Sequence, residues 1–458
     1  MSKTFPSGFL DSLKAAPGFT EEAFIEVHQK EELITSVRLN PFKPLDVNDL
    51  AFELCDQIPW SSNGYYLDAR PSFTSDPFFH AGAYYVQEAS SMFLEQVMRQ
   101  TCNLKEPLKV LDLCAAPGGK STLIQSLISE ESMLVSNEVI KPRVNILAEN
   151  ISKWGAANVV VSNNDPRDFA RLPGYFDLIV VDAPCSGSGL FRKDPDAMEE
   201  WSLSNVALCS QRQQRILFDV IPSLKPGGIL IYSTCSYSLE EDEQLCDIIM
   251  AELGLESIQI KTDSDWNIVE TVSEKQGAFG YRFYPDRLKG EGFFIAAFRK
   301  KEGVVVKQQG KGKQSIQTVQ KSVLPILRLW VEDSAVNGYF QWQQELRLFP
   351  AAMLAEIPVL QNALYLRKAG IQLGELVRQD LIPAHELAMS HVFNKTLNFI
   401  DVDLETALNY LRRQDISLPA SKPGWALIKF KDLPLGWVKI LPNRVNNYYP
   451  KDWRILNK

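Results

Sequence analysis

The sequence predicts an α/β protein built around a doubly wound, mostly parallel sheet of the Rossmann type. Three observations support this fold class. Short apolar runs alternate with helical stretches between residues 109 and 300, a pattern typical of parallel strands joined by crossover helices. A loop of small residues follows the first run, where such sheets bind their ligands. With 458 residues, the chain also exceeds what one core usually supports, so we expect about three domains.

The predicted strands of the central domain are Lys109–Leu113, Met133–Asn137, Asn158–Ser162, Phe176–Ala183, Gly228–Thr234 and Phe293–Phe298. Helical stretches lie between them, for example Ser121–Ser129 and Arg143–Lys153. Ligands of an open α/β sheet bind outside the carboxyl ends of its strands. We therefore expect the functional residues directly after these runs.

Five regions divide the chain. They are a mostly helical or mixed region at 1–95, the sheet domain at 96–300, a basic linker at 301–322, a small α+β domain at 323–395 and a β-rich module at 396–458. The linker is assigned because the sequence there becomes rich in Gln, Lys and Gly and loses its apolar periodicity. The last module is assigned from the runs WALIKF and GWVKIL, which Pro and Gly separate.

The net charge of −8 is distributed unevenly. Arg299–Lys321 contains seven basic residues and one acid, and Ser421–Lys458 contains eight and two. Each segment thus carries +6, which leaves −20 on the rest of the chain. A solubilising linker and an ordinary basic face would explain these segments. Because aromatic residues such as Trp425 and Trp453 interleave with the charges of the tail, contact with RNA is an equal alternative there.

Several classes of protein are disfavoured by composition. The first residues, MSKTFPSGFLDSLK, lack the apolar core of a signal peptide, and no apolar run is long enough to span a membrane. Seven cysteines, an odd number, argue against a disulfide framework and for a reducing cytosol. Zinc-type Cys and His spacing is absent, so we expect no metal. We therefore expect a cytoplasmic, monomeric protein.

The loop after the first strand, in KVLDLCAAPGGKST (Lys109–Thr122), predicts a cofactor site. Small residues before a helix let backbone N–H groups approach a ligand closely. The dinucleotide fingerprint G-x-G-x-x-G is absent, and Cys114 replaces the first glycine of a phosphate-binding loop, which argues against ATP or GTP. S-adenosyl-L-methionine fits better, since it needs such a loop and an acid for its ribose.

Two acids follow the next two strands. Glu138 is near the position where an acid accepts hydrogen bonds from ribose hydroxyls, and Asp165 could bind the adenine amino group. Each acid alone is more often a capping or solvated residue. Lys120 could neutralise the methionine carboxylate or face solvent. The predicted cofactor-binding residues are Cys114, Ala115, Ala116, Pro117, Gly118, Gly119, Lys120, Glu138, Asp165 and Asp182.

Cys185, in DAPCSG, and Cys235, in STCS, each follow a predicted buried strand and would face the same crevice. A thiolate is a strong carbon nucleophile, so this pair indicates covalent chemistry. A single buried cysteine more often packs as a small hydrophobe. Ser238 and Glu241 form an S-x-x-E pattern that predicts a helix start after Cys235, which would lower the pKa of its thiol.

Four motifs resemble, in order and spacing, the Nop/Sun family of RNA 5-methylcytosine methyltransferases. They are LDLCAAPGGKST, the NE pair at 137–138, DAPCSGSGLFRKDPDA and YSTCSYSLEEDE, within about 38–299. The tail PLGWVKILPNRVNNYYPKDWR is similar to the PUA-related domain of the bacterial RsmF type, which modifies 16S ribosomal RNA. The resemblance implies that Cys235 is the nucleophile and that Cys185 assists release. The asparagine of the family's EEN motif is missing here, which puts its role in doubt.

The chemistry explains why a thiol is needed. Carbon 5 of cytosine is a weak nucleophile, and thiolate addition at carbon 6 makes an enamine that can attack the sulfonium methyl group. A base then removes the carbon-5 proton and the thiolate leaves. Asp182, three residues before Cys185, is placed to hold N3 and the exocyclic amine. The target base must leave its stack to reach the thiol.

Regions 1–95 and 396–458 are expected to bind the RNA, which we predict to be 16S ribosomal RNA or the small ribosomal subunit. Arg192 and Lys193 are predicted to hold its phosphates. Tyr84, Gln87 and Trp201 could line its path. The alternatives are the same chemistry on transfer RNA, or a non-catalytic RNA-binding factor for ribosome assembly, although a scaffold has no need of two thiols.

Overall fold

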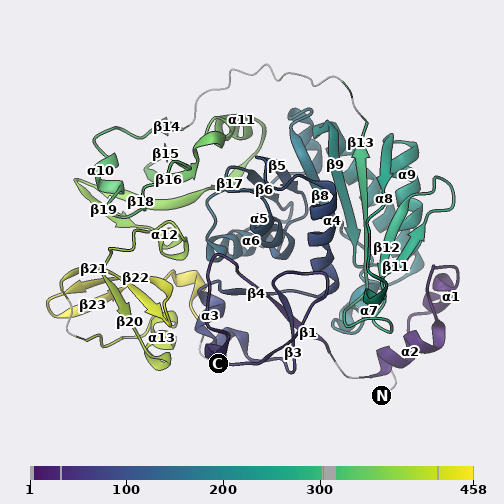
Figure 1. Ribbon diagram of the computed structural model, residues 1–458, viewed down its shortest axis with the longest axis horizontal. Coiled ribbons are helices and arrows are strands. Elements are labelled where there is room, and N and C mark those ends of the chain that lie inside the picture. Colours follow the sequence, from purple (N-terminus) through teal and green to yellow (C-terminus); the bar gives the residue numbers. More distant parts are fainter. Residues whose placement is uncertain (1–4, 31–32, 302, 304–315, 420–421, 457–458) are drawn as a thin grey trace.

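The computed structural model describes the chain except residues 1–4, 31–32, 302, 304–315, 420–421 and 457–458 (Figure 1). Most of the predicted basic linker at 301–322 therefore lies outside the described residues. In the part that is described, no helix is long and apolar enough to cross a membrane.

The N-terminal region contains a four-stranded antiparallel sheet, in the order β2-β3-β1-β4. Its elements are α1 (Phe9–Leu13), α2 (Glu21–Gln29), β1 (Thr35–Leu39), β2 (Leu54–Gln57), β3 (Gly64–Leu67), α3 (Pro77–His80) and β4 (Tyr84–Val86). The expectation that this region is mostly helical was wrong. Its strands have only three to five residues, which is too short for an alternating pattern to stand out.

The central sheet has ten strands, nine of them in the order β11-β12-β13-β9-β8-β5-β6-β7-β17, with β10 beside β13. The parallel strands are β5 (Lys109–Asp112), β6 (Met133–Asn137), β7 (Val159–Ser162), β8 (Phe176–Asp182) and β9 (Leu224–Thr234). The other strands of the domain are β10 (Leu255–Ile258), β11 (Val269–Val272), β12 (Phe279–Phe283) and β13 (Phe293–Lys300). The predicted doubly wound sheet is confirmed, but the sheet is mixed, because the five strands β10–β13 and β17 pair antiparallel. The chain order reverses between β5 and β8, so the ligand crevice is expected at their carboxyl ends.

Helices cover both faces of this sheet (Figure 1). They are α4 (Leu94–Thr101), α5 (Gly119–Leu127), α6 (Lys141–Trp154), α7 (Pro195–Glu200), α8 (Leu203–Val220) and α9 (Glu243–Ala251). Successive residues of a strand point to opposite faces, and β8 shows the consequence. Leu178 and Val180 join the core under α4, α5 and α6, whereas Ile179 and Val181 join the core under α8 and α9.

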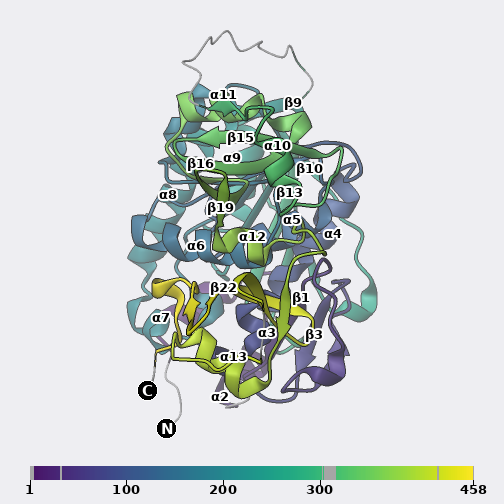
Figure 2. The ribbon, with the colours of Figure 1, turned by 90° about the vertical axis from the view of Figure 1, so that its left-hand side faces the viewer.

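The C-terminal part forms two further sheets, one above the other along the same side of the central sheet (Figures 1 and 2). The first contains β14 (Gln317–Thr318), β15 (Asn337–Trp342), β16 (Glu345–Pro350), β18 (Ile371–Val377) and β19 (Asp380–Pro383), and the second β20 (Phe399–Asp401), β21 (Gly424–Phe430), β22 (Leu433–Leu441) and β23 (Arg444–Asn447). The helices are α10 (Leu324–Leu327), α11 (Glu356–Ala363), α12 (His385–Met389) and α13 (Leu404–Leu411). The strands expected at WALIKF and GWVKIL are β21 and β22.

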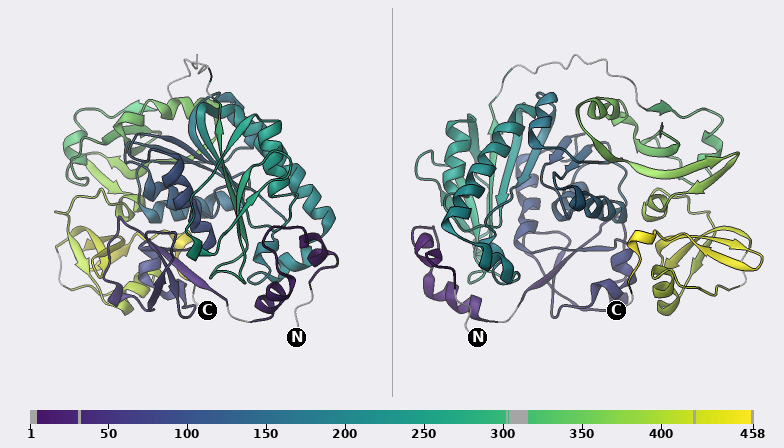
Figure 3. Two further views of the ribbon diagram at one scale, coloured as in Figure 1. Left: turned by 45° about the vertical axis from the view of Figure 1, so that its right-hand side comes forward. Right: turned by 180° about the vertical axis from the view of Figure 1, so that it is seen from behind.

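One strand of the C-terminal part joins the central sheet. β17 (Leu366–Ala369) pairs antiparallel with β7, so that the segment after α11 forms the edge of the central sheet (Figures 1 and 3). This pairing brings the beginning of β17 to the carboxyl end of β7, where the cofactor crevice is expected. The domain after the linker is thus part of the sheet that carries the site.

Candidate active site

The two predicted thiols meet at the ends of the neighbouring strands β8 and β9. The Sγ atoms of Cys185 and Cys235 are 2.9 Å apart, and both residues are half-buried and free of disulfides. The hydrogen bond to Cys235 and the burial of Cys185 raise the pKa of the Cys185 thiol well above its ordinary value. Two thiolates this close would repel each other, so the geometry favours one thiolate and one thiol in the pair.

A single buried carboxylate holds both cysteine loops. Glu241 accepts hydrogen bonds from the backbone N–H of Ser186 at 2.9 Å and from the hydroxyl of Ser236 at 2.7 Å. The Ser186 hydroxyl and the Gln213 amide also donate to it. Burial raises the pKa of Glu241, and these donors oppose the rise. Each serine directly follows a cysteine, so the carboxylate fixes the position of one thiol relative to the other.

The predicted helix start at Ser238 and Glu241 was wrong. Helix α9 begins at Glu243, after Asp242, and the Ser238 hydroxyl is buried without a hydrogen-bond partner among the described residues. The Glu241 carboxylate instead accepts hydrogen bonds from the two cysteine loops. Sequence analysis therefore missed Glu241 as a site residue, and the only available signal was a serine after each cysteine.

A second set of contacts, made by Asp242 and Arg282, also fixes the Cys235 loop. Asp242 accepts a hydrogen bond from the Thr234 hydroxyl at 2.7 Å and lies 3.1 Å from Arg282 of β12. Arg282 also donates to the Tyr237 carbonyl at 2.9 Å. On the other side, the backbone N–H of Gly189 donates to the Cys235 carbonyl at 2.8 Å. A Cβ at Gly189 would lie 2.4 Å from a backbone oxygen, so only glycine permits this approach.

Asp182, the last residue of β8, contacts both β9 and the first turn of α5. One of its carboxylate oxygens accepts from the Ser233 hydroxyl, and the other lies 2.8 Å from the Lys120 ammonium. Burial lowers the pKa of Lys120, but the charge of Asp182 and its hydrogen bond outweigh that effect and raise it. About a third of the Asp182 side chain is exposed. Lys120, predicted to neutralise the cofactor, is therefore already paired with Asp182.

The loop Cys114–Lys120 runs from β5 to α5, as predicted. Its carbonyl groups are held from α6, because Asn150 donates to Pro117 at 2.8 Å and Arg143 donates to Ala116. Beneath the loop, Asp112 is fully buried. One carboxylate oxygen accepts from the Ser121 hydroxyl, whereas the other has no partner among the described residues. Burial raises the pKa of Asp112 to about 7.

The acids after β6 and β7 have local partners. Glu138 accepts from the backbone N–H of Ile140 at 2.8 Å and is almost fully buried. Asp165 caps the short helix Pro166–Arg171 and lies 3.6 Å from Arg215. Their predicted contacts with ribose and adenine stay predictions. Beside Glu138, about half of the Val139 and Ile140 side chains is exposed. Sequence analysis missed this apolar surface, which could pack against a flat ring.

The residues expected to contact RNA are mostly buried. Arg192 and Lys193 lie 3.8 Å and 3.9 Å from the carboxylate of the buried Glu291. Only 4% of the Arg192 side chain is exposed, against 31% for Lys193. Phosphate binding by these two residues stays a prediction, and Lys193 has the greater access. Tyr84, Gln87 and Trp201 are all buried, so none of them presents its side chain freely to an RNA strand.

The chain is similar to known ribosomal RNA methyltransferases over most of its length. Family models match three stretches: 16S rRNA methyltransferase RsmB/F at 99–299, the N-terminal domain of 16S rRNA methyltransferase RsmF at 5–89, and the methyltransferase RsmF PUA domain at 397–455. The ribosomal RNA small subunit methyltransferase F of Aeromonas salmonicida is 30% identical over 92% of this chain and 91% of its own. That of Vibrio parahaemolyticus is 30% identical over 98% and 97%.

Two solved structures share the fold. A methyltransferase homologue from Pyrococcus horikoshii is 29% identical and has a TM-score of 0.51, covering 64% of this chain and 99% of its own. The NSun6 protein of the same organism is 21% identical with a TM-score of 0.54, covering 66% and 100%. The likeness spans about two thirds of the present chain.

Proposed function

Because the chain belongs to the RsmB/F family of ribosomal RNA small subunit methyltransferases, we propose that it methylates carbon 5 of a cytosine in 16S ribosomal RNA. The methyl donor in this proposal is S-adenosyl-L-methionine. The observation that carries the proposal is the pair of thiols, 2.9 Å apart, at the ends of the neighbouring parallel strands β8 and β9. Methyl transfer to an oxygen or to an amine would require no second thiol.

The two thiols take different parts. The Cys235 thiolate adds to carbon 6 of the cytosine, and the electrons of the 5,6 double bond move towards carbon 5. Asp182 accepts a hydrogen bond from the exocyclic amine, while the nearby Lys120 charge stabilises the electron-rich ring. S-adenosyl-L-methionine, when bound, would supply an electrophilic methyl group to carbon 5, and breaking its S–CH3 bond would leave neutral S-adenosylhomocysteine. The adduct then carries both the new methyl group and the original proton on carbon 5.

Release requires a base at that moment. Since the hydrogen bond to Cys235 is the main cause of the raised pKa of Cys185, covalent attachment of Cys235 removes that cause. Cys185 then loses its proton to solvent more readily, and its thiolate takes the proton from carbon 5. The electrons of the broken C–H bond restore the 5,6 double bond and expel the Cys235 thiolate. Adduct formation thereby activates the residue that ends it.

The residues present fit the proposed cofactor. An ammonium group would satisfy the carboxylate oxygen of Asp112 that has no partner among the described residues. Glu138 would bind the ribose, and the exposed Val139 and Ile140 would pack against the adenine. Asp165 would bind the adenine amino group.

The proposal is tested by bisulfite sequencing of 16S and transfer RNA incubated with the protein and S-adenosyl-L-methionine. We expect one or more protected cytosines in 16S ribosomal RNA, and none with Cys235→Ala. The control Cys55→Ala changes an exposed cysteine on β2 and should retain activity. Protection only in transfer RNA would refute the substrate, and full activity of Cys235→Ala would refute the nucleophile.

Cys185→Ala tests the second thiol. We expect this variant to form the adduct but not to resolve it, so that RNA stays covalently attached to Cys235. Denaturing gel electrophoresis of the protein with labelled RNA measures the adduct. The double variant with Cys235→Ala should show no such band. Normal turnover by Cys185→Ala would contradict the assigned release step.

A further inference from the structure

We propose that a cavity between the N-terminal sheet and α6 binds a second nucleobase of the RNA substrate. The proposal rests on the proposed function, because it assumes an RNA substrate. It adds a binding site outside the thiol and cofactor sites. The expected occupant is an unpaired base with its phosphate, because proteins recognise RNA mostly at loops, bulges and ends whose unstacked bases can be bound.

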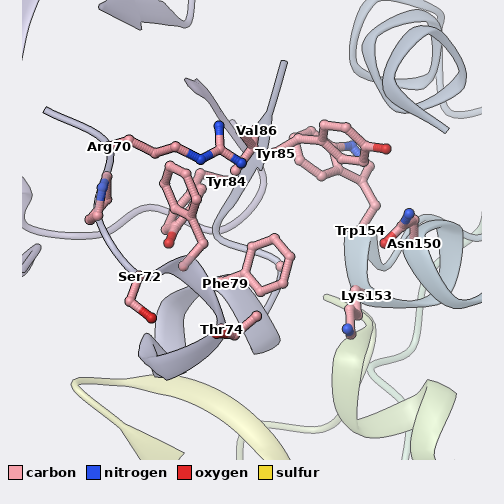
Figure 4. Close-up of a pocket in the computed structure, with 13 residues that line it drawn as sticks. Arg70, Ser72, Thr74, Phe79, Tyr84, Tyr85, Val86, Asn150, Lys153 and Trp154 are labelled. Carbon is pink, nitrogen blue, oxygen red and sulfur yellow. The ribbon is translucent and has the colours of Figure 1, made fainter. Parts of the chain in front are cut away.

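The cavity has a volume of about 430 Å³ and is walled mainly by aromatic rings (Figure 4). The rings are those of Phe73, Phe79, Tyr84, Tyr85 and Trp154. In Figure 4, Arg70 reaches along one edge of the cavity, and Asn150, Lys153 and Trp154 face it from α6. This volume falls within the range of roughly 300 to 1,000 Å³ typical of small-ligand pockets. The site is thus large enough for a nucleobase with its sugar.

The lining suits a base better than an apolar ligand. Aromatic side chains bind unpaired bases of any sequence by stacking, and Phe79 and Tyr85 are half-buried at the cavity, where their rings can be reached. Tyr84 is a fixed wall, since its hydroxyl donates to Asp76 at 2.6 Å. Ser72 and Thr74 are exposed and provide hydroxyl groups at the mouth.

The charge at the mouth is also suitable for a phosphate. Arg70 is exposed, and its guanidinium lies 5.6 Å from the centre of the Phe73 ring. Within the described ranges of the chain it forms no ion pair. Lys153, by contrast, is paired with Glu149 and is almost fully buried. Arg70 is therefore the cation that remains available for the backbone of a bound nucleotide.

The cavity shares two walls with the cofactor loop. The Tyr85 ring lies against Gly119, where a Cβ would be 3.3 Å from the ring. Asn150 donates to the Pro117 carbonyl at 2.8 Å. The cavity contains no cysteine, and the thiols follow β8 and β9, so the bound base cannot be the one that is methylated. A base in this cavity would contact the residues that hold the cofactor loop in place.

Photo-crosslinking tests the inference without relying on methyl transfer. Ultraviolet irradiation of the full chain with 16S ribosomal RNA, followed by mass spectrometry, should attach a nucleotide to a peptide containing Phe79 or Tyr85. Thr74→Trp places a large ring at the exposed mouth and should abolish that crosslink. The control Ser204→Trp changes a hydroxyl residue at the start of α8 and should leave it unchanged. A crosslink that persists in Thr74→Trp would overturn the proposal.

Binding measurements supply the second test. Arg70→Glu should weaken binding of 16S ribosomal RNA about tenfold. Lys105→Glu reverses another exposed charge, in the segment before β5 and outside the lining of the cavity, and should change affinity much less. Equal losses in both variants would indicate general electrostatics and refute the site. Crosslinking and selective binding without any methylated cytosine would refute the proposed function while leaving the base-binding cavity intact.

Discussion

The thiol site and the cofactor crevice differ in how completely their own residues satisfy one another. Around the thiols, Glu241 receives four donors from two loops and a helix. In the crevice, Asp112 keeps one buried oxygen without a partner in the described structure, and Val139 and Ile140 are half-exposed. Under the proposed function, the nucleophile would be preorganised by the protein alone, whereas the crevice would be completed by its ligand. Removal of a residue should accordingly affect turnover in the first region and ligand affinity in the second.

The largest effect is expected from Glu241→Ala. The substitution leaves the buried donors of Ser186 and Ser236 unpaired, which should lower the free energy of unfolding by roughly 3 kcal/mol. Because the two thiols lose their common support, we expect kcat to fall about 100-fold with little change in KM for RNA. Urea unfolding and steady-state kinetics measure the two effects.

Two variants separate this positioning role from a general loss of stability. Glu240→Ala removes an exposed neighbouring carboxylate and should leave both quantities nearly unchanged. Glu241→Gln keeps part of the hydrogen bonding and should restore stability more than kcat, since the amide can accept at only one oxygen. If the alanine variant lost stability but kept its kcat at low temperature, Glu241 would not position the thiols, and turnover would not depend on the contacts around them.

The thiol pair was predictable from sequence because each cysteine directly follows a long buried run, and Rossmann topology brings such positions to one edge. The Glu241 contacts were not, because Ser238 and Glu241 have the spacing of a helix cap equally well. Glu241 binds the cysteine loops rather than capping a helix because its partner there is Ser186, which is 55 residues away in the chain. Similarly, nothing in the four residues of β17 indicates pairing with β7. Local patterns predict elements, whereas distant partners decide what polar groups do.

Ligand binding in the cofactor crevice should depend on pH, because the crevice contains the buried carboxyl group of Asp112. Burial raises the pKa of Asp112 to about 7, so the free protein holds a proton there below pH 7. A bound ammonium group favours the carboxylate, so ligand binding releases that proton. Affinity for S-adenosylhomocysteine should therefore increase about tenfold between pH 6 and pH 8 and level off above. Isothermal titration calorimetry at several pH values measures the slope.

The same raised pKa affects stability with the opposite sign. The folded protein keeps a proton on Asp112 up to about pH 7, whereas the unfolded chain releases it near pH 4. The stability that this proton contributes is therefore lost as the pH rises towards 7. Asp112→Asn should remove the pH dependence of binding and weaken affinity at pH 8. Asp177→Asn, which changes a carboxylate at the amino end of β8, should retain it. If the affinity of the unmodified protein did not change with pH, Asp112 would not be the residue that binds the ammonium group of the ligand.

The smallest effect concerns the edge where the C-terminal part joins the crevice. Asn164 accepts from the Tyr365 backbone N–H at 2.9 Å and donates to its carbonyl at 3.1 Å, while Asn163 donates to the carbonyls of Glu138 and Val139. Asn164→Ala should loosen β17 by about 1 kcal/mol per lost hydrogen bond and weaken S-adenosylhomocysteine binding about twofold. Hydrogen exchange of β17 and calorimetry measure these changes. Asn362→Ala removes a local bond within α11 and should alter neither. Exchange in β17 could increase while ligand affinity stays constant. The C-terminal part would then stabilise the sheet edge without contributing to the crevice, and the residues that affect ligand affinity would extend no further than β7.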